Sequence, residues 1–211
     1  MQEHDIHAVE LSALRFDELE PLVNSLDGLP LESFSYVSFH APSSFSSDRE
    51  QRVLELLQPV YRRGWNIIVH PDVIYTPSRW ACLGSQLLVE NMDRRKALGR
   101  TASELADAFK HLPDARLCLD VAHARQLDTT LTVLWEIIRN FRERIGEIHI
   151  SELDSRCRHL PMSGAAVKDY RQLLGQGNCV TPVIIESMLE TSLATLRMDE
   201  FQMAQNALAE R

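Results

Sequence analysis

Six short apolar runs in this chain each end on a histidine, an aspartate or a glutamate. The runs are residues 35–40, 66–70, 86–90, 116–120, 146–149 and 182–186, and their last residues are His40, His70, Glu90, Asp120, His149 and Glu186. The intervals between these last residues are 30, 20, 30, 29 and 37 positions. Intervals of this size fit a β-strand and a crossover helix repeated along the chain.

Such a repeat predicts an α/β fold of the TIM-type (β/α) barrel. The runs are apolar on both parities, as expected for strands that are covered by helices outside and packed with side chains inside. In a TIM barrel the carboxyl ends of all strands meet at one face, and active sites lie there. The six polar residues are therefore expected to converge on one site, although they are far apart in the sequence.

The remaining elements complete the pattern but leave it one unit short. A further strand is expected at residues 6–12, helices at 16–26, 47–64, 101–112, 129–144, 166–174 and 189–208, a short helix after Pro77, and a long loop at 151–164. Seven strand–helix units result, whereas a closed barrel has eight. We therefore expect a single domain over residues 1–211 that is a shortened barrel with the usual first strand missing. An open parallel edge favours aggregation, so we also expect a homo-oligomer that covers this seam.

Composition restricts the partners. The chain has 211 residues, 45% apolar and 25% charged, with a formal net charge of −8. This acidic total does not favour nucleic acid or anionic membranes, although it does not exclude a local basic groove. The N-terminus does not read as a signal peptide, and no apolar run approaches the roughly 18 residues of a membrane span. The four cysteines have no tight pairing pattern, so we expect free thiols in the cytoplasm.

The convergence of carboxylates predicts a metal centre. Ionised carboxylates that lie together repel and raise one another's pKa unless a cation neutralises them. A divalent ion between Glu90, Asp120 and Glu186 would remove that cost, and His149 would add a nitrogen ligand. A mixed set of carboxylates and imidazole suits zinc, manganese, cobalt or iron. A single such residue at a strand end would more often be structural; six in register favour a metal.

Further polar residues follow the fifth and sixth strands. His123 is either a ligand or a donor to substrate. The segment 155–162 brings Arg156, Cys157, Arg158 and His159 together. It is either a solvated basic loop or a wall that holds an anionic or hydroxylated substrate, with His159 beside the metal. The segment Asp93-Arg-Arg-Lys96 has the same two interpretations, because it follows Glu90 closely.

Taken together, these motifs resemble the xylose isomerase-like TIM-barrel superfamily, which includes sugar phosphate isomerases/epimerases and the endonuclease IV-type AP endonuclease family 2. The matching motifs are His40-Ala-Pro42, His70-Pro-Asp72, Glu90-Asn91, Asp120-Val-Ala-His123, His149-Ile-Ser151, His159-Leu-Pro161 and Glu186. They follow the family's order over residues 35–187. Each motif is weak alone, and the seven in sequence are specific.

The epimerase branch of this resemblance implies one metal held by Glu90, Asp120, His149 and Glu186. Glu90 and Glu186 would flank the substrate and exchange a proton on neighbouring carbons through a metal-stabilised enediolate. His123 and Arg158 would hold substrate oxygens.

The endonuclease branch implies three metals. His40, His70 and Glu90 would hold the first, and Glu90, Asp120, His149 and Glu186 the second. His123, His159 and an aspartate two residues before that histidine would hold the third. This chain has Cys157 at the aspartate position; cysteine also binds zinc, which makes Cys157 a candidate third-site ligand.

Three functions stay open at this point. The leading one is a metal-dependent isomerase or epimerase of a small sugar-like or phosphorylated substrate. The second is a multinuclear phosphodiester hydrolase, which would use His40 and His70. The third is a non-catalytic barrel used for binding or assembly. The number of ions, from one to three, separates the first two.

Overall fold

Parallel strands form the centre of the molecule. The computed structural model describes residues 6–174, 181–189 and 194–209. The strands of the main sheet are β1 (Ala8–Ser12), β2 (Tyr36–His40), β3 (Asn66–Val69), β4 (Leu87–Glu90), β5 (Arg116–Asp120), β6 (Ile145–Ile150) and β9 (Val183–Ile185). They are all parallel and lie in the order β1-β2-β3-β4-β5-β6-β9. The prediction of seven strands in a shortened TIM barrel is confirmed.

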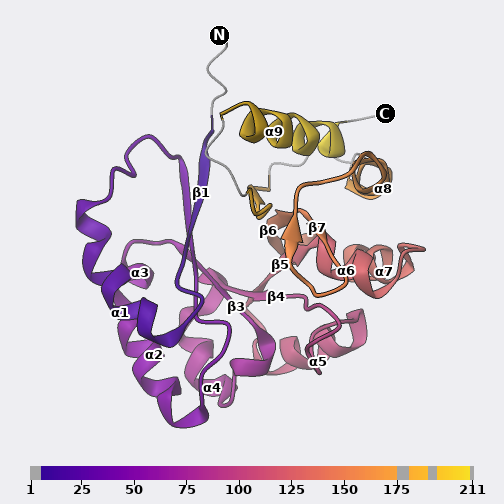
Figure 1. The fold of residues 1–211 in the computed structure, drawn as a ribbon. Coiled ribbons are helices and arrows are strands. Elements are labelled where there is room, and N and C mark those ends of the chain that lie inside the picture. Colours follow the sequence, from indigo (N-terminus) through magenta and orange to yellow (C-terminus); the bar gives the residue numbers. More distant parts are fainter. Residues whose placement is uncertain (1–5, 175–180, 190–193, 210–211) are drawn as a thin grey trace.

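Helices connect the strands and cover the outside of the sheet (Figure 1). They are α1 (Phe16–Ser25), α2 (Glu50–Leu56), α3 (Gln58–Arg62), α4 (Pro77–Trp80), α5 (Ala102–His111), α6 (Val121–Leu127), α7 (Thr132–Phe141), α8 (Gly164–Leu174) and α9 (Ala194–Leu208). Among the described residues, no helix is long and apolar enough to cross a membrane.

Side-chain alternation along the strands divides the interior into two regions. Strand residues such as Phe39, Val69 and Leu119 point outward and join the large core under the helices. Residues of the other parity point into the barrel, where Ile68, Leu88 and Cys118 form a small apolar cluster of their own. Cys118 thus packs as a small apolar side chain beside Ile68 and Leu88. The apolar cluster belongs to β3, β4 and β5, so the interior beside β1, β2 and β6 is left to polar side chains.

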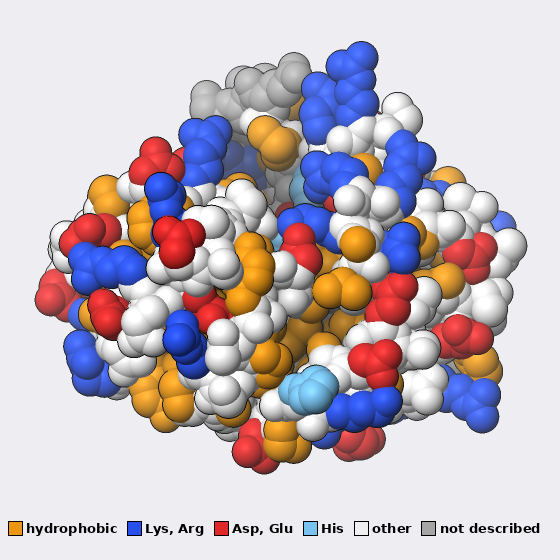
Figure 2. All heavy atoms as spheres, turned by 90° about the horizontal axis from the view of Figure 1, so that it is seen from below, with side chains coloured by type: hydrophobic (Ala, Val, Ile, Leu, Met, Phe, Trp, Pro, Cys, Tyr) orange, Lys and Arg blue, Asp and Glu red, His pale blue; other side chains and the backbone are white. Residues whose placement is uncertain are grey.

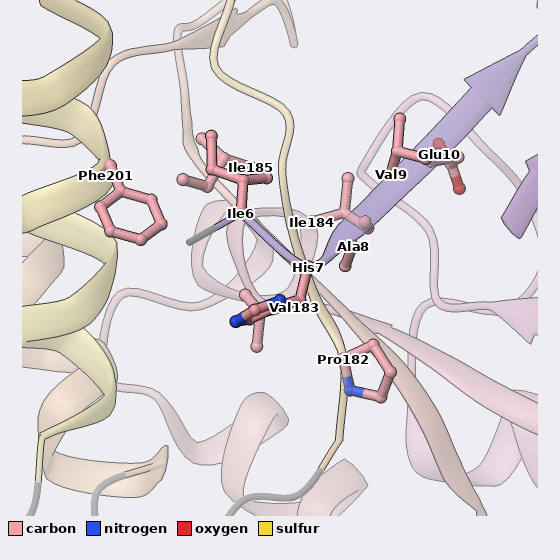
Figure 3. Close-up of a pocket in the computed structure, with 10 residues that line it drawn as sticks. All are labelled: Ile6, His7, Ala8, Val9, Glu10, Pro182, Val183, Ile184, Ile185 and Phe201. Atoms are coloured by element: carbon pink, nitrogen blue, oxygen red, sulfur yellow. The ribbon is translucent and has the colours of Figure 1, made fainter. Parts of the chain in front are cut away.

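The barrel is open between its first and last strands. The sheet has β1 at one edge and β9 at the other, and no ladder joins them within the part of the chain that the structure describes. A cavity of about 480 Å³ lies at this seam. Its lining is mostly apolar and comes from β1, from the chain around β9 and from Phe201 of α9 (Figure 3). This is the place where the missing strand was expected.

Two of the predicted elements were wrong. The helix expected at 129–144 is shorter, because the Asp128 carboxylate accepts hydrogen bonds from the N–H groups of Thr130, Thr132 and Val133 and so sets the start of α7. A separate helix, α6, precedes it. The loop expected at 151–164 contains a short antiparallel pair, β7 (Glu152–Leu153) and β8 (His159–Leu160). The last helix is described from residue 194, and residues 190–193 lie outside the described part of the chain.

Candidate metal centre

Four of the predicted ligands lie together at the carboxyl ends of their strands. Glu90, Asp120, His149 and Glu186 each offer a ligand atom, and these atoms lie within 4.8 Å of one another. The register of the sheet explains part of this arrangement, because Asp120 on β5 is paired with His149 on β6. His149 Nδ1 is 3.2 Å from Glu186 Oε1 and 3.7 Å from Glu90 Oε1. Three strands and the residue after a fourth thus supply one compact ligand set.

His40 and His70 form a second group with Glu90. The Nε2 atoms of both histidines face the same oxygen, Glu90 Oε2, at 3.2 and 3.1 Å. Their rings meet edge to face with centroids 5.1 Å apart. His40 is oriented by a contact of 2.7 Å between its Nδ1 and the carbonyl oxygen of Ala41. All three side chains are buried, so this group is a part of the interior and not of the surface.

Asp120, His123 and His159 form a third group. His123 Nδ1 is 3.4 Å from both Asp120 Oδ2 and Glu90 Oε1. His159 Nδ1 lies 2.8 Å from the Ser151 hydroxyl and 3.5 Å from Glu186 Oε2. The three groups share Glu90 and Asp120, so the predicted ligands form one continuous cluster.

The turn after β5 holds two of these ligands in place. Asp120 is the N-cap of α6 and accepts a hydrogen bond from the His123 N–H at 2.7 Å. The Asn91 side chain pairs with the backbone of Asp120 through two hydrogen bonds of 2.8 Å. The Asn91 carbonyl oxygen lies 2.8 Å from His123 Nδ1. The motif Asp120-Val-Ala-His123 therefore positions its ligands by local helix capping.

Several ligand atoms have no hydrogen-bond partner among the described residues. These buried side-chain atoms include His70 Nδ1, Asp120 Oδ2, His149 Nδ1 and Glu186 Oε2. An unsatisfied buried polar atom costs about 1–3 kcal/mol. These atoms belong to the ligand groups, and a cation would satisfy oxygen and nitrogen lone pairs at once. The residues present therefore fit a divalent metal.

The protonation behaviour reflects crowded charge. Burial raises the pKa of Asp120 well above its ordinary value. Burial also raises the pKa of Glu90, but hydrogen bonds with His149, His40 and His70 outweigh it and hold that pKa well below its ordinary value. For His40, burial lowers the pKa, but Glu90 and Glu10 raise it to about 9. Neighbouring acidic groups outweigh burial and raise the pKa of His123 and His149 as well, whereas burial lowers the pKa of His70 and His159.

Six of the eight predicted ligands line a pocket of about 520 Å³, whereas Asp120 and His149 are fully buried and do not line it. Met92, Arg95, Arg158 and Met188 also contribute to its wall. Seen from below, the molecule carries Lys and Arg side chains mixed with acidic ones, and a histidine is visible in a hollow between them (Figure 2). The pocket has the size of a small-molecule site.

Two residues of the loop near β8 lie differently from the ligands. Cys157 is buried, lines the pocket and adopts a positive φ of 59°. Its thiol donates to Gln126 Oε1 at 3.3 Å, and its sulfur is not within the group of Asp120, His123 and His159. Arg158 lines the pocket with its guanidinium 2.8 Å from Asp154. The segment after Glu90 is only partly solvated, because Asp93 is buried and forms a salt bridge to Arg95.

Two acidic residues of the site were not selected from the sequence. Glu10 on β1 and Glu147 on β6 are both buried inside the barrel. His149 Nε2 is 2.8 Å from Glu147 Oε1 and 3.2 Å from Glu10 Oε2. A signal for Glu147 existed: it lies two positions before His149, and residues two apart on a strand face the same side.

Comparisons with known proteins extend this picture at the level of fold. No family model matches the sequence, and a search of curated proteins also gives no match. Among solved structures, endonuclease IV from Thermus thermophilus matches with a TM-score of 0.54 and 17% identity over 96% of this chain and 98% of that chain.

Two further structures match in the same way. The 3-keto-D-glucoside 4-epimerase from E. coli has a TM-score of 0.53 and 16% identity over 89% of this chain and 86% of its own. The probable 3-DHS dehydratase from Bacillus anthracis has a TM-score of 0.54 and 11% identity over 95% and 88%. Identities this low speak to fold and leave the reaction open. The chain therefore shares the barrel fold of these three structures, in a shortened form with seven parallel strands, and the fold that the sequence resemblance implies is confirmed.

Proposed function

We propose that this chain is a divalent-metal-dependent isomerase or epimerase that acts on a small sugar-like or phosphorylated substrate. The observation that carries the proposal is the group of Glu90, Asp120, His149 and Glu186, of which Glu90 and Glu186 line a pocket of small-molecule size. Structures with this fold include several enzymes, one of which is a sugar epimerase. The fold alone does not select a reaction, so the argument depends on the site.

The four residues of that group would hold the ion. Zinc, manganese, cobalt or iron would suit this mixture of carboxylates and imidazole. When bound, the ion would act as a Lewis acid on a substrate oxygen and stabilise negative charge there. Atoms of Asp120, His149 and Glu186 that lack a hydrogen-bond partner among the described residues support this assignment.

Glu90 and Glu186 are the residues that would move the proton. Both line the pocket. Burial raises the pKa of Glu186, but the charge of His149 and a hydrogen bond with it outweigh burial and hold that pKa below its ordinary value, so that the carboxylate is ionised. The Glu186 side chain is 19% exposed, whereas that of Glu90 is 1% exposed. Glu186 would take the proton from one carbon, and Glu90 would serve the neighbouring carbon.

Substrate size and charge follow from the pocket wall. A volume of about 520 Å³ suits a monosaccharide or its phosphate. Arg95 and Arg158 lie on the wall and His123 at its base, so these side chains would hold substrate oxygens. The same volume, together with the net charge of −8, disfavours a nucleic-acid duplex.

A second candidate is a multinuclear phosphodiester hydrolase. The observation in its favour is that His40 and His70 both face Glu90 Oε2, while Asp120, His123 and His159 form another group. Three overlapping ligand groups exceed what one ion requires, and paired ions assist the displacement of a leaving oxygen.

Metal counting and solvent-exchange experiments test the two candidates together. Elemental analysis of protein purified with zinc or manganese should give about one ion per chain for the isomerase and two or three for the hydrolase. Incubation with ketoses and their phosphates in D₂O should introduce deuterium beside the carbonyl, and Glu186→Gln should abolish this exchange. Glu55→Gln, an exposed carboxylate of α2, is the control. The proposal fails if the purified protein contains no divalent metal and if Glu90→Ala and Glu186→Ala are both as active as the wild type.

The open seam supports a proposal about partners. A second copy of this chain would cover the apolar cavity between β1 and β9, which includes Val183, Ile185 and Phe201 (Figure 3). Light scattering at micromolar concentration should then give the mass of a dimer, and a monomer would contradict it. If a partner chain instead filled the cleft between Glu90 and Glu186, the non-catalytic alternative would be favoured. The cytoplasm remains the proposed location, supported by the free thiols of Cys82, Cys118 and Cys157.

A further inference from the structure

His149 lies between two different carboxylate environments. Its Nδ1 atom faces the proposed ligand group, 3.2 Å from Glu186 Oε1, and has no hydrogen-bond partner among the described residues. Its Nε2 atom faces the barrel interior, 2.8 Å from Glu147 Oε1. A ring nitrogen must give up its hydrogen to bind a cation, and the hydrogen bond of the other nitrogen decides which one does so. The orientation of this ring is therefore a property that another residue has to fix.

Glu147 is itself held by donors from the far side of the barrel. The Ser38 hydroxyl donates to Glu147 Oε1 at 3.2 Å, and the Tyr36 hydroxyl donates to Glu147 Oε2. Asn66 Nδ2 in turn donates to the Tyr36 hydroxyl oxygen at 2.8 Å. These donors belong to β2 and β3, whereas Glu147 belongs to β6, so the network crosses the interior. A carboxylate fixed at both oxygens has little freedom to turn away from His149.

Glu10 is a weaker candidate for the same task. Its Oε2 atom is 3.2 Å from His149 Nε2, and that oxygen has no hydrogen bond of good geometry within the described part of the chain. Its other oxygen accepts from Ser12, two residues away on the same strand. Glu10 also lies on β1 at the open seam. Glu147 has the shorter contact with His149 and the better-anchored side chain.

We infer that Glu147 is a positioning residue that accepts the Nε2 hydrogen of His149 and thereby presents its Nδ1 lone pair to the metal. This inference rests on the proposed function, since it takes His149 as a ligand. It adds a residue from the layer below the ligand cluster, held across the barrel by Tyr36 and Ser38. An acceptor of this kind orients the ring and makes the ligating nitrogen more basic.

Zinc affinity and the tautomer of His149 test the inference. Glu147→Met removes the acceptor and should weaken Zn²⁺ binding about 10–100-fold in competition with a chelating dye. Glu147→Gln keeps an acceptor oxygen and should retain most of the affinity. Glu50→Gln is the matched control: Glu50 is also a buried carboxylate, but it accepts hydrogen bonds from Tyr75, Thr76 and Trp80 and does not line the pocket. It should leave Zn²⁺ affinity unchanged.

The NMR readout does not depend on a variant that folds. Long-range ¹H–¹⁵N correlation spectra of the zinc-loaded wild type should show His149 with its hydrogen on Nε2. A hydrogen on Nδ1, or unchanged affinity in Glu147→Met, would overturn the inference. Cys118, Glu147 and His149 also lie within 4.8 Å of one another. If Glu147→Met loses one equivalent of zinc while the remaining zinc binds with unchanged affinity, Glu147 is itself a ligand and the inference that it positions His149 is refuted. If wild-type protein binds no zinc, the metal centre itself fails instead.

Discussion

Replacing Asp120 by asparagine should change stability in opposite directions with and without metal. Asp120 is fully buried, and its Oδ1 caps α6 by accepting the His123 N–H. Its Oδ2 has no hydrogen-bond partner among the described residues, and burial raises the pKa of this carboxyl. Asparagine caps helices as well as aspartate does. The substitution therefore keeps the fold of the turn and changes only the charge and the unsatisfied oxygen.

The expected change in stability can be worked out separately for metal-free and zinc-loaded protein. In metal-free protein, the asparagine NH₂ group would replace an oxygen that lacks a hydrogen-bond partner and lies beside Glu90 and Glu186. This change should raise the free energy of unfolding by about 1–2 kcal/mol. For a chain of this size that corresponds to a rise in Tm of roughly 2–8 °C. Zinc at 100 times its Kd stabilises the wild type by about 2.7 kcal/mol, or roughly 5–11 °C. If the variant binds 100-fold more weakly, the same zinc contributes only about 0.4 kcal/mol.

Thermal unfolding by calorimetry measures both states. Chelator-treated and zinc-loaded samples of the wild type and Asp120→Asn should be compared. Asp107→Asn, on the exposed face of α5, is the control and should change neither the metal-free Tm nor the zinc-induced shift in Tm. The reasoning is refuted if metal-free Asp120→Asn melts below the wild type while the zinc-induced shift stays the same. That result would mean that Asp120 stabilises the fold as a structural carboxylate and not as a ligand.

Three further variants test other parts of the structure. Leu134→Ala removes a fully buried side chain of α7 and should cost about 2–5 kcal/mol in urea unfolding; a cost below about 1 kcal/mol would contradict the packing. Burial raises the pKa of Glu50, but hydrogen bonds from Thr76, Trp80 and Tyr75 lower it below its ordinary value. Its carboxylate thus stabilises the fold above pH 4.5 and loses this effect as the pH falls further, so Glu50→Gln should flatten the urea-measured pH dependence in that range. Cys157→Gly relieves a left-handed backbone and should raise metal-free stability by about 1 kcal/mol; a loss of bound zinc in the same variant would establish the thiol as a ligand.

The sequence was informative wherever a residue ended a strand. Runs that are apolar at both odd and even positions predicted where the parallel strands lie. Because parallel strands end at the same face, the residues that end them, Glu90, Asp120 and His149, were expected to converge. Helix boundaries were less predictable, because local side chains set them. Asp128 determines where α7 begins by binding three backbone N–H groups, and apolar periodicity does not report such a contact.

The interior layer below the ligands was missed for a different reason. The last residue of each apolar run identifies one ligand per strand. The residue two positions earlier, which faces the same side, is then left out. Glu147 and Ser38 occupy that earlier position on β6 and β2, and their contact joins strands 109 residues apart in the chain. Because a seven-stranded barrel is narrow, polar groups on opposite strands meet across it. The parity of Glu147 can be read from its position on the strand, whereas its partner across the barrel cannot.

Glu90 shows why strand-end residues cannot be assigned one by one. Its Oε2 faces His40 and His70, while its Oε1 faces His123 and His149. An ion bound by the group of His40 and His70 therefore alters the charge on a carboxylate that the group of Asp120, His149 and Glu186 also uses. Glu90→Gln would weaken the first and second ligand groups together, because both contain Glu90, and so could not separate the two ions. His70→Gln could, because His70 contacts this cluster only through Glu90 Oε2 and His40 among the contacts of the described residues. Loss of one ion with the isomerase exchange intact would make the first group an accessory site, whereas loss of turnover with that ion would favour the hydrolase.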